Sequence, residues 1–198
     1  MDRSNLIKKF KKEVIKASSN PSFIHHTWFV KYHLEIVERI AHDLLAYYPE
    51  ADRDVVEVLV WLHDYGKAID FNNEYQATLI HGKPKLLDIG FDADFTKKLI
   101  DYIELMDRKM EVDLHDAPIE VQIVSSADGC SHMVGPFLHL WWWENSTKPF
   151  TELMADNRFK LDKDWNRKIV LPEARKAFEN RHNVLIEETG EIPDHFIV

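Results

Sequence analysis

The stretch VVEVLVWLHDYGK, residues 55–67, joins an apolar run to a histidine, an aspartate and a lysine. Taken alone, an apolar run of this length fits either a buried strand or a buried helix. Its length, the acidic residues that lead it, with Asp54 as a candidate N-cap, and Gly66 at its end all favour the helix. We therefore predict a helix over residues 54–65 that is buried on nearly all sides.

Apolar residues recur at helical spacing in much of the remaining chain. The sequence has only 6 glycines and 8 prolines, so it has little material for the many tight turns of a β-sandwich or β-barrel. We therefore predict an all-α fold. The expected helices are an amphipathic N-terminal helix around residues 6–15, helices over 33–48, 93–107 and 165–188, and a helix that begins near Pro118 and is interrupted at Gly135-Pro136. Pro172 either kinks the last helix or marks its true start.

Charge and length limit the classes of function. A chain of 198 residues fits a single domain, residues 1–198, and no linker rich in glycine or serine divides it. The formal net charge is -9, from 34 acidic and 25 basic side chains. This balance opposes broad nucleic-acid binding, which needs a cationic surface. A small phosphorylated substrate remains compatible with it, because a few local cations can outweigh a distant negative field.

Cysteine usage and hydropathy point to a cytoplasmic protein. The single cysteine, Cys130, excludes an internal disulfide and a zinc site built from thiolates. The N-terminal stretch is rich in lysine and lacks the apolar centre of a signal peptide. No uncharged apolar run approaches the ~20 residues that span a bilayer. We therefore expect a cytoplasmic protein that does not enter a membrane.

Candidate metal ligands lie in three of the predicted helices. His63 and Asp64 close the apolar helix, where an unpaired imidazole and carboxylate would be costly to bury. A divalent cation satisfies both groups, because imidazole nitrogen and carboxylate oxygen are common metal ligands. His33 lies thirty residues upstream and Asp128 far downstream in SSADGCSH, each within an apolar helical pattern. Four such side chains on three helices match the way helical bundles build metal centres.

This ordered set resembles a known family. The order His33, then LHDYGK over residues 62–67, then ADGCSHMVG over residues 127–135, is similar to the HD-domain superfamily of metal-dependent phosphohydrolases. The resemblance covers residues 28–135 and implies an HD-domain-like helical bundle in which His33, His63, Asp64 and Asp128 hold the metal. Residues 136–198 would then form an additional C-terminal helical segment packed on this core.

The resemblance also bears on the number of metal ions. His81-Gly82 looks like a family element that supplies a second metal or contacts the substrate. Dinuclear members usually carry a further histidine where this chain has IELMDRKM, residues 103–110, in which Asp107 would be the substitute. We therefore expect one divalent ion per chain, with a second ion near His81 less favoured. Mn, Fe, Ni, Zn, Co and Mg all suit a set of histidines and aspartates.

The function that the resemblance implies is hydrolysis of a phosphomonoester or phosphodiester through a metal-activated water. The substrate would be a small phosphorylated metabolite or a nucleotide. Lysine and arginine near the metal would offset the phosphate charge, and a histidine would move the proton. The residues expected to act are Asp64, Lys67 and His81 in catalysis, and Lys67, Lys83, Arg108 and His132 in substrate binding.

Two other functions remain open at this point. A di-iron oxygenase on the same fold would need the extra histidines that IELMDRKM lacks. A non-catalytic sensor or scaffold would keep the metal for stability and show no turnover.

Several polar and aromatic segments have simpler interpretations. Adjacent Trp141, Trp142 and Trp143 are expected to pack the C-terminal segment against the bundle or to form a homodimer contact. The mixed-charge stretch over residues 156–167 is typical of solvated surface, with a lid that offers Arg158 or Lys160 to a phosphate as the alternative.

Overall fold

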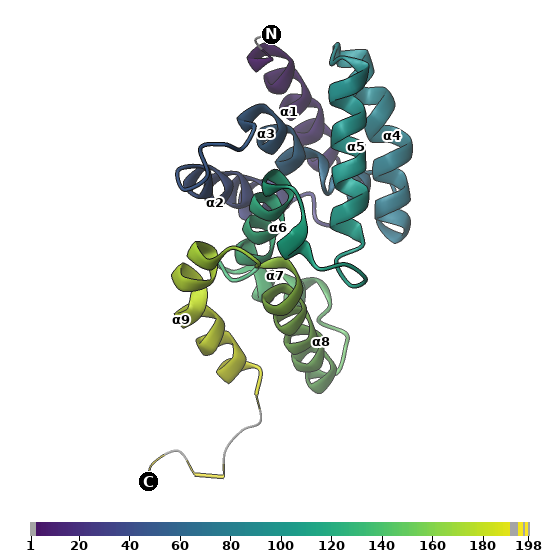
Figure 1. The fold of residues 1–198 in the computed structure, drawn as a ribbon. Helices are drawn as coiled ribbons and strands as arrows, with labels where there is room; N and C mark the ends of the chain where they lie inside the picture. Colours follow the sequence, from purple (N-terminus) through teal and green to yellow (C-terminus); the bar gives the residue numbers. More distant parts are fainter. Residues whose placement is uncertain (1–2, 191–193, 196, 198) are drawn as a thin grey trace.

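The computed structural model describes residues 3–190, 194, 195 and 197, whereas the predicted domain bounds also include the residues outside this description. Within the described residues the chain is all-helical and has no strand, which confirms the predicted fold class (Figure 1). The α-helices are α1 (Ser4–Ser18), α2 (Glu35–Leu45), α3 (Arg53–Leu62), α4 (Glu74–Ile89), α5 (Ala93–Asp107), α6 (Ile119–Ser131), α7 (Phe137–Glu144), α8 (Phe150–Lys163) and α9 (Pro172–Glu188).

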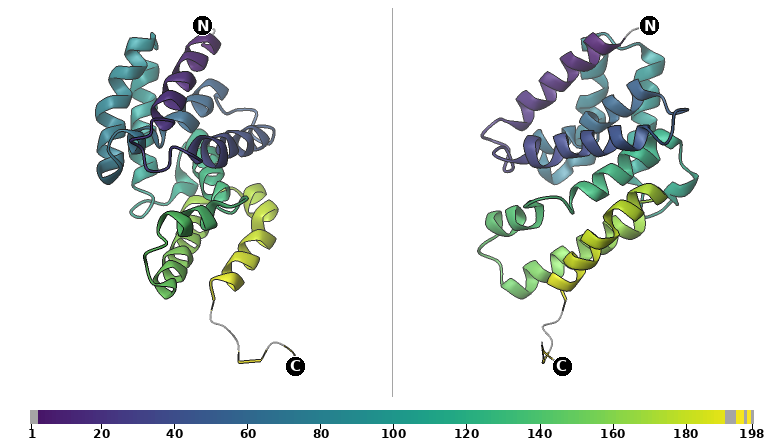
Figure 2. Two further views of the ribbon diagram at one scale, coloured as in Figure 1. Left: turned by 180° about the vertical axis from the view of Figure 1, so that it is seen from behind. Right: turned by 90° about the vertical axis from the view of Figure 1, so that its left-hand side faces the viewer.

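Helix α6 lies in the middle of the molecule. It separates α1–α5 from α7–α9, and the view from the side shows it running between these two groups (Figure 2). It packs against α2, α3, α5 and α9. Every residue from Ile123 to Ser131 is buried, so polar groups of this helix that face inward must find partners inside the protein.

The apolar run that opened the sequence forms α3. All residues from Val55 to Leu62 except Glu57 are buried. The helix begins and ends slightly earlier than predicted, and Asp52 is its N-cap in place of Asp54. The Asp52 carboxylate accepts hydrogen bonds from the backbone N–H groups of Asp54 and Val55, at 3.0 and 3.3 Å. A short 3-10 turn, Tyr65–Ala68, follows.

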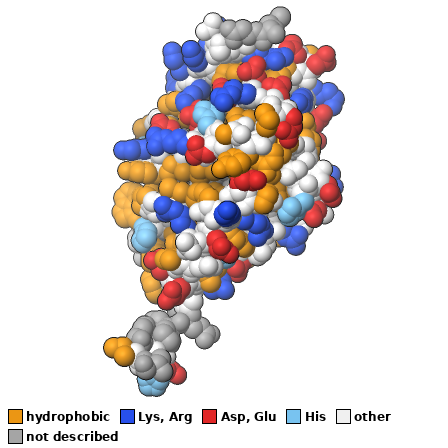
Figure 3. All heavy atoms as spheres, turned by 60° about the vertical axis from the view of Figure 1, so that its left-hand side comes forward, with side chains coloured by type: hydrophobic (Ala, Val, Ile, Leu, Met, Phe, Trp, Pro, Cys, Tyr) orange, Lys and Arg blue, Asp and Glu red, His pale blue; other side chains and the backbone are white. Residues whose placement is uncertain are grey.

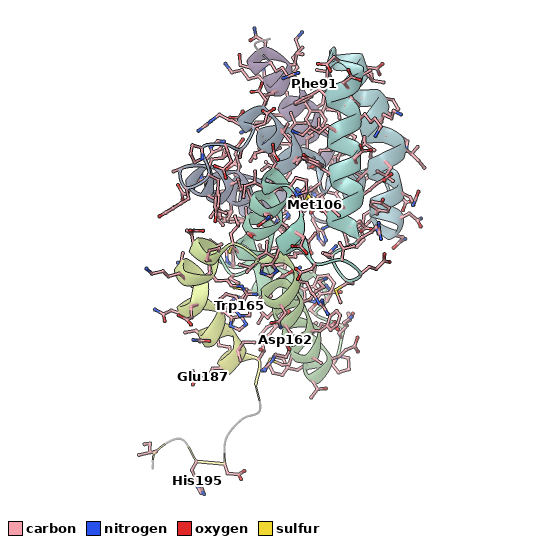
Figure 4. The ribbon with its side chains drawn as sticks, in the orientation of Figure 1. Phe91, Met106, Asp162, Trp165, Glu187 and His195 are labelled. Carbon is pink, nitrogen blue, oxygen red and sulfur yellow. The ribbon has the colours of Figure 1, made fainter. Side chains whose placement is uncertain are left out.

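The C-terminal third differs from its prediction. The stretch of mixed charge forms α8, and the helix predicted over residues 165–188 is divided. Its first part is a turn of π-helix, Asp164–Lys168, in which the Ile169 N–H donates to the Asp164 carbonyl at 3.0 Å. Pro172 then begins α9, because proline has no N–H to continue the preceding helix. Trp165 stacks on His182 of α9 with ring centroids 4.1 Å apart and joins the two parts (Figure 4).

The surface carries mixed charge. On the face drawn in Figure 3, side chains of lysine and arginine alternate with those of aspartate and glutamate, and apolar side chains gather toward one edge at mid-height. At the N-terminus, α1 buries Ile7, Phe10 and Val14 and exposes most of its lysines. Lys11 is the exception, because it pairs with Glu38 at 2.7 Å. Among the described helices, none combines the length and apolar character that a bilayer span requires.

Gly66 provides a test of how closely the turn after His63-Asp64 approaches α4. A Cβ atom at this position would lie 1.9 Å from the Glu74 carbonyl oxygen and 2.4 Å from the Thr78 nitrogen. Because both are backbone atoms of α4, Gly66→Ala should lower the free energy of unfolding by about 3 kcal/mol. Urea denaturation measures the change. The matched control is Lys83→Ala at an exposed position of α4, and a Gly66→Ala value no larger than that of the control would contradict the close approach.

Candidate metal centre

The structure brings the four predicted metal ligands together from three elements. His33 lies in a π-helical turn, Val30–Leu34, that leads into α2. His63 and Asp64 follow the end of α3, and Asp128 lies in α6. The Nε2 atom of His33 lies 3.1 Å from Asp64 Oδ2 and 3.8 Å from Asp128 Oδ1. The Nε2 atom of His63 lies 3.5 and 3.8 Å from the same two oxygens.

A fifth side chain completes the cluster. His132 lies one turn after Asp128 on α6, and its Nε2 atom is 3.4 Å from Asp128 Oδ1. Its ring stacks on that of His33 at an interplanar angle of 4°. Two overlapping groups are therefore spaced as metal ligands: His33, His63 and Asp64, and His33, Asp128 and His132.

The contact of His33 Nδ1 with Ser131 decides which ring nitrogen of His33 carries the proton. The hydroxyl of Ser131 donates its only hydrogen to the Asp128 carbonyl at 2.7 Å. Its oxygen, 3.0 Å from His33 Nδ1, must then accept a hydrogen bond from that nitrogen. The neutral imidazole then has its lone pair on Nε2, 3.1 Å from Asp64 Oδ2. Because an ionised carboxylate can only accept, this contact is favourable only with a proton or a cation between the two atoms.

His63 and His132 are oriented in the same way. His63 Nδ1 lies 2.8 Å from the Val60 carbonyl, which can only accept. His132 Nδ1 lies 2.8 Å from a carboxylate oxygen of fully buried Asp164. Both rings thus keep Nδ1 protonated and point an Nε2 lone pair inward. The inward Nε2 of His63 is buried and has no hydrogen-bond partner among the described residues.

These donors fit a divalent cation. Three nitrogen lone pairs face two carboxylates, and without a proton or a cation between them such acceptors repel one another. Burial lowers the pKa of His33 and lowers that of His132 to about 3, which disfavours the extra proton. Histidine whose second nitrogen is held by a carboxylate or carbonyl is the usual arrangement of a metal ligand. The two donor groups, His33 with His63 and Asp64 and His33 with Asp128 and His132, share the one free lone pair of His33. The set therefore suits a single ion.

Two lysines hold the carboxylates in their ionised form. Lys67 Nζ lies 2.8 Å from Asp64 Oδ2, and Lys168 Nζ lies 2.5 Å from Asp128 Oδ2. Burial alone would raise the pKa of each carboxyl group. For Asp64 the neighbouring His63 and Lys67 outweigh burial, and for Asp128 the charge of Lys168 does so, so that both pKa values lie well below the usual range. Both aspartates are therefore ready to bind a cation.

The centre opens into a cavity of about 120 Å³ that is rich in lysine. Met106, at the end of α5 in Figure 4, forms part of its apolar wall. The charged residues that line it are Lys67, Lys109, Lys160, Lys163 and Lys168 together with Asp64, Glu74, Asp107 and Asp128. Five cations against four carboxylates make a local environment that accepts an anion, although the whole chain is acidic.

Comparisons with protein families, with curated proteins and with solved structures find no match to this chain. The donors, tautomers and charges of the centre describe a site that could hold a metal ion beside an anion.

The structure does not bring three of the predicted residues to this centre. His81 lies in the middle of α4 with its side chain exposed, and it does not line the cavity. Lys83 is exposed on the same helix. Arg108 follows α5 and pairs with Glu111 at 3.1 Å. The expectation that His81, Lys83 and Arg108 gather at the metal centre is therefore corrected, because none of the three lines this cavity.

Other functional residues were missed or given a lesser role. Lys67 lines the cavity as expected. Lys160, in a stretch that the sequence favoured as solvated surface, lines it too, and His132 is a candidate ligand and not only a substrate contact. Asp164 and Lys168 received no role. A signal for them exists in the sequence, because residues 160, 164 and 168 recur every four positions and so share one helical face.

Replacement of Asp164 tests whether its contact with His132 Nδ1 strengthens the binding of a metal ion. Asp164→Asn keeps the shape and an acceptor for His132 Nδ1 but removes the charge, so the affinity for Mn²⁺ or Zn²⁺ should fall roughly 10–100-fold. Calorimetric titration of the metal-free protein measures this loss. The matched control is Asp162→Asn, two residues earlier at an exposed position (Figure 4). Equal metal affinity in both variants would show that Asp164 does not act on the ligand.

Proposed function

We propose that this chain is a metal-dependent phosphohydrolase of the HD-domain type, with one divalent ion per chain. The proposed reaction is hydrolysis of a phosphomonoester or phosphodiester in a small metabolite or nucleotide. Two independent lines support it: the ordered sequence motif, and the donor geometry of the residues that the motif names. The observation that carries the proposal is that a cluster of metal donors opens directly into a cavity lined by lysines.

His33, His63, Asp64, Asp128 and His132 would hold the ion. When bound, a divalent cation polarises both water and phosphoryl oxygen, which is the chemistry that phosphoester hydrolysis requires. The chain's own contribution is to hold these donors in place, through Ser131, the Val60 carbonyl and Asp164. Such preorganised contacts lower the cost of reorganisation during the reaction.

The lysines suit the phosphate. Five lysines and four carboxylates line the cavity, and a divalent ion would add two positive charges, so the net charge of the lining would be about +3. A phosphate dianion would offset most of it. Lys67 and Lys168 are engaged with the two aspartates at 2.8 and 2.5 Å, and Lys160 lies 3.5 Å from Asp164. Lys109 and Lys163 are the cavity lysines best placed to contact phosphoryl oxygens, and Lys160 could do so from its looser pair. Glu74, which also lines the cavity, replaces His81 as the proposed proton acceptor.

The competing functions receive no specific support from this geometry. A di-iron oxygenase needs two ions, whereas the two donor groups compete for His33. A metal-binding sensor or scaffold predicts a bound ion without turnover, and the first experiment below separates it from a hydrolase.

Asp64→Ala tests the proposed reaction. The substitution removes a metal donor and leaves Lys67 without its partner, so metal binding and phosphate release should both be lost, at least 100-fold in kcat/KM by an order-of-magnitude estimate. The helical circular dichroism should remain, because Asp64 lies outside α3. The control is Asp101→Ala, an exposed residue of α5. A metal-loaded wild-type protein that hydrolyses no member of a broad phosphoester panel would overturn the hydrolase and favour the sensor.

The pH dependence of phosphate binding tests Lys160. Burial lowers the pKa of Lys160 to about 8, although the nearby Asp164 acts in the opposite direction. The ammonium group is therefore charged below this pH and neutral above it. Inhibition by inorganic phosphate, expressed per phosphate dianion, should weaken as the pH rises from about 7.5 to about 9. Expressing it per dianion removes the contribution of phosphate itself, which still loses its second proton at the start of this range. Lys160→Arg should remove most of this dependence, since arginine remains charged. An identical pH profile in the variant would exclude the role of Lys160.

A further inference from the structure

A second and larger cavity adjoins the metal centre. Its volume is about 430 Å³, within the range of small-molecule sites. Its walls come from the segment before α2, from the start of α7 and from α8. Six aromatic side chains line it: Trp28, Phe29, Phe71, Phe137, Trp141 and Phe159. Such a concentration of aromatic surface is not needed to bind phosphate.

The two cavities meet at the metal donors. Lys67, Glu74, His132 and Lys160 line both. His33 lines the aromatic cavity, whereas His63, Asp64 and Asp128 line the one rich in lysine. The donor cluster therefore lies in the wall between a cationic compartment and an aromatic one, where the bond between phosphorus and the ester oxygen of a bound substrate would be placed.

We infer that the aromatic cavity holds the organic group of the substrate and that this group is a planar aromatic ring, not a sugar or an open-chain polyol. This inference rests on the proposed function for its phosphate end. With the phosphate among the lysines, the ester oxygen points through the shared wall, and the organic group enters the aromatic compartment. That orientation places the anion in the compartment with more lysines and the apolar group against the aromatic side chains.

The walls favour a ring for a physical reason. Aromatic rings stack face to face or edge to face and gain more than their buried area alone provides. Trp28 and Phe137 meet edge to face at 5.6 Å, and the apolar residues that line the cavity are all aromatic, so the lining lacks flexible aliphatic side chains. The hydroxyls of a polyol would lose hydrogen bonds to water against the aromatic part of the walls. The lining also includes His25, Lys148 and Asp156, and the last two pair with each other at 2.9 Å. Asn157, 1% exposed, offers one amide nitrogen without a partner among the described residues, so the wall can still bind one polar substituent of the ring.

Paired ligands with equivalent phosphorus groups isolate the contribution of the ring. The esters are 2-phenylethyl phosphate and glycerol 3-phosphate, whose leaving groups are both primary alcohols. Their non-hydrolysable counterparts are 3-phenylpropylphosphonate and 3,4-dihydroxybutylphosphonate, and n-hexyl phosphonate is the apolar ligand without a ring. Calorimetry on the metal-loaded protein should give an affinity for the phenyl ligand roughly 30-fold higher than for the dihydroxy ligand. The same preference should appear in kcat/KM for the esters.

Variants locate the effect. Phe159→Ala and Trp141→Ala should each weaken binding of 3-phenylpropylphosphonate about fivefold or more and change the dihydroxy ligand less than about twofold. Phe159 is 65% exposed, so its removal should not disturb folding. Trp143→Ala is the matched control, because Trp143 is also 65% exposed but does not line this cavity, and it should leave every affinity unchanged.

The outcomes distinguish the two proposals. Ring-dependent binding that is lost in Phe159→Ala, without hydrolysis of any ester, would retain the aromatic compartment and reject the hydrolase. Hydrolysis of both esters with similar kcat/KM, unaffected by either variant, would retain the hydrolase and overturn the inference. Equal affinity for n-hexyl phosphonate and 3-phenylpropylphosphonate would also overturn it, because the compartment would then select apolar groups irrespective of a ring.

Discussion

Three imidazole lone pairs and two carboxylates face one another in the interior of the helical bundle, where little water can separate them. Their mutual repulsion must be offset by the side chains and backbone groups that contact them. The neighbouring groups must neutralise the carboxylates without occupying the nitrogen atoms, and they must keep each ring from turning. Lys67 and Lys168 meet the first requirement, and Ser131, the Val60 carbonyl and Asp164 meet the second. What remains is a cluster of donors that a divalent cation would stabilise.

Helix α6 carries the largest part of this arrangement. It supplies Asp128 and His132 as candidate ligands and Ser131 as the partner of His33, all on a helix that is almost wholly buried. Gly129 lets the π-helical turn approach from the other side, since a Cβ atom there would lie 2.7 Å from Ile169. Both π-helical turns of the described chain, at residues 30–34 and 164–168, place charged or ligand side chains at the centre. Such turns are frequent at functional sites because they displace a side chain from regular helical register.

The same centre also divides two environments. On one side the lining is cationic and small, and on the other it is aromatic and larger. A net charge of -9 gave no indication of a local cationic compartment, because net charge sums over the whole surface while binding depends on the few groups within a Debye length or less. The helices after residue 136 create this division. Helix α8 contributes Lys160 to both compartments and Phe159 to the aromatic one, so the segment with no resemblance to a family forms the walls where substrates would be selected.

The pattern of amino acids predicts the all-α fold, the burial of the helix that ends before His63, and the order of the four candidate ligands. These features follow from periodicity and from the cost of burying unpaired polar groups, which local sequence records. Tertiary structure alone decided that His81, Lys83 and Arg108 face solvent, that Asp164 supports His132, and that Trp141 lines a cavity with Phe159. The physical reason is that a helix has several faces. Spacing along the chain shows which residues share a face, but only packing against other helices decides which face turns toward the centre.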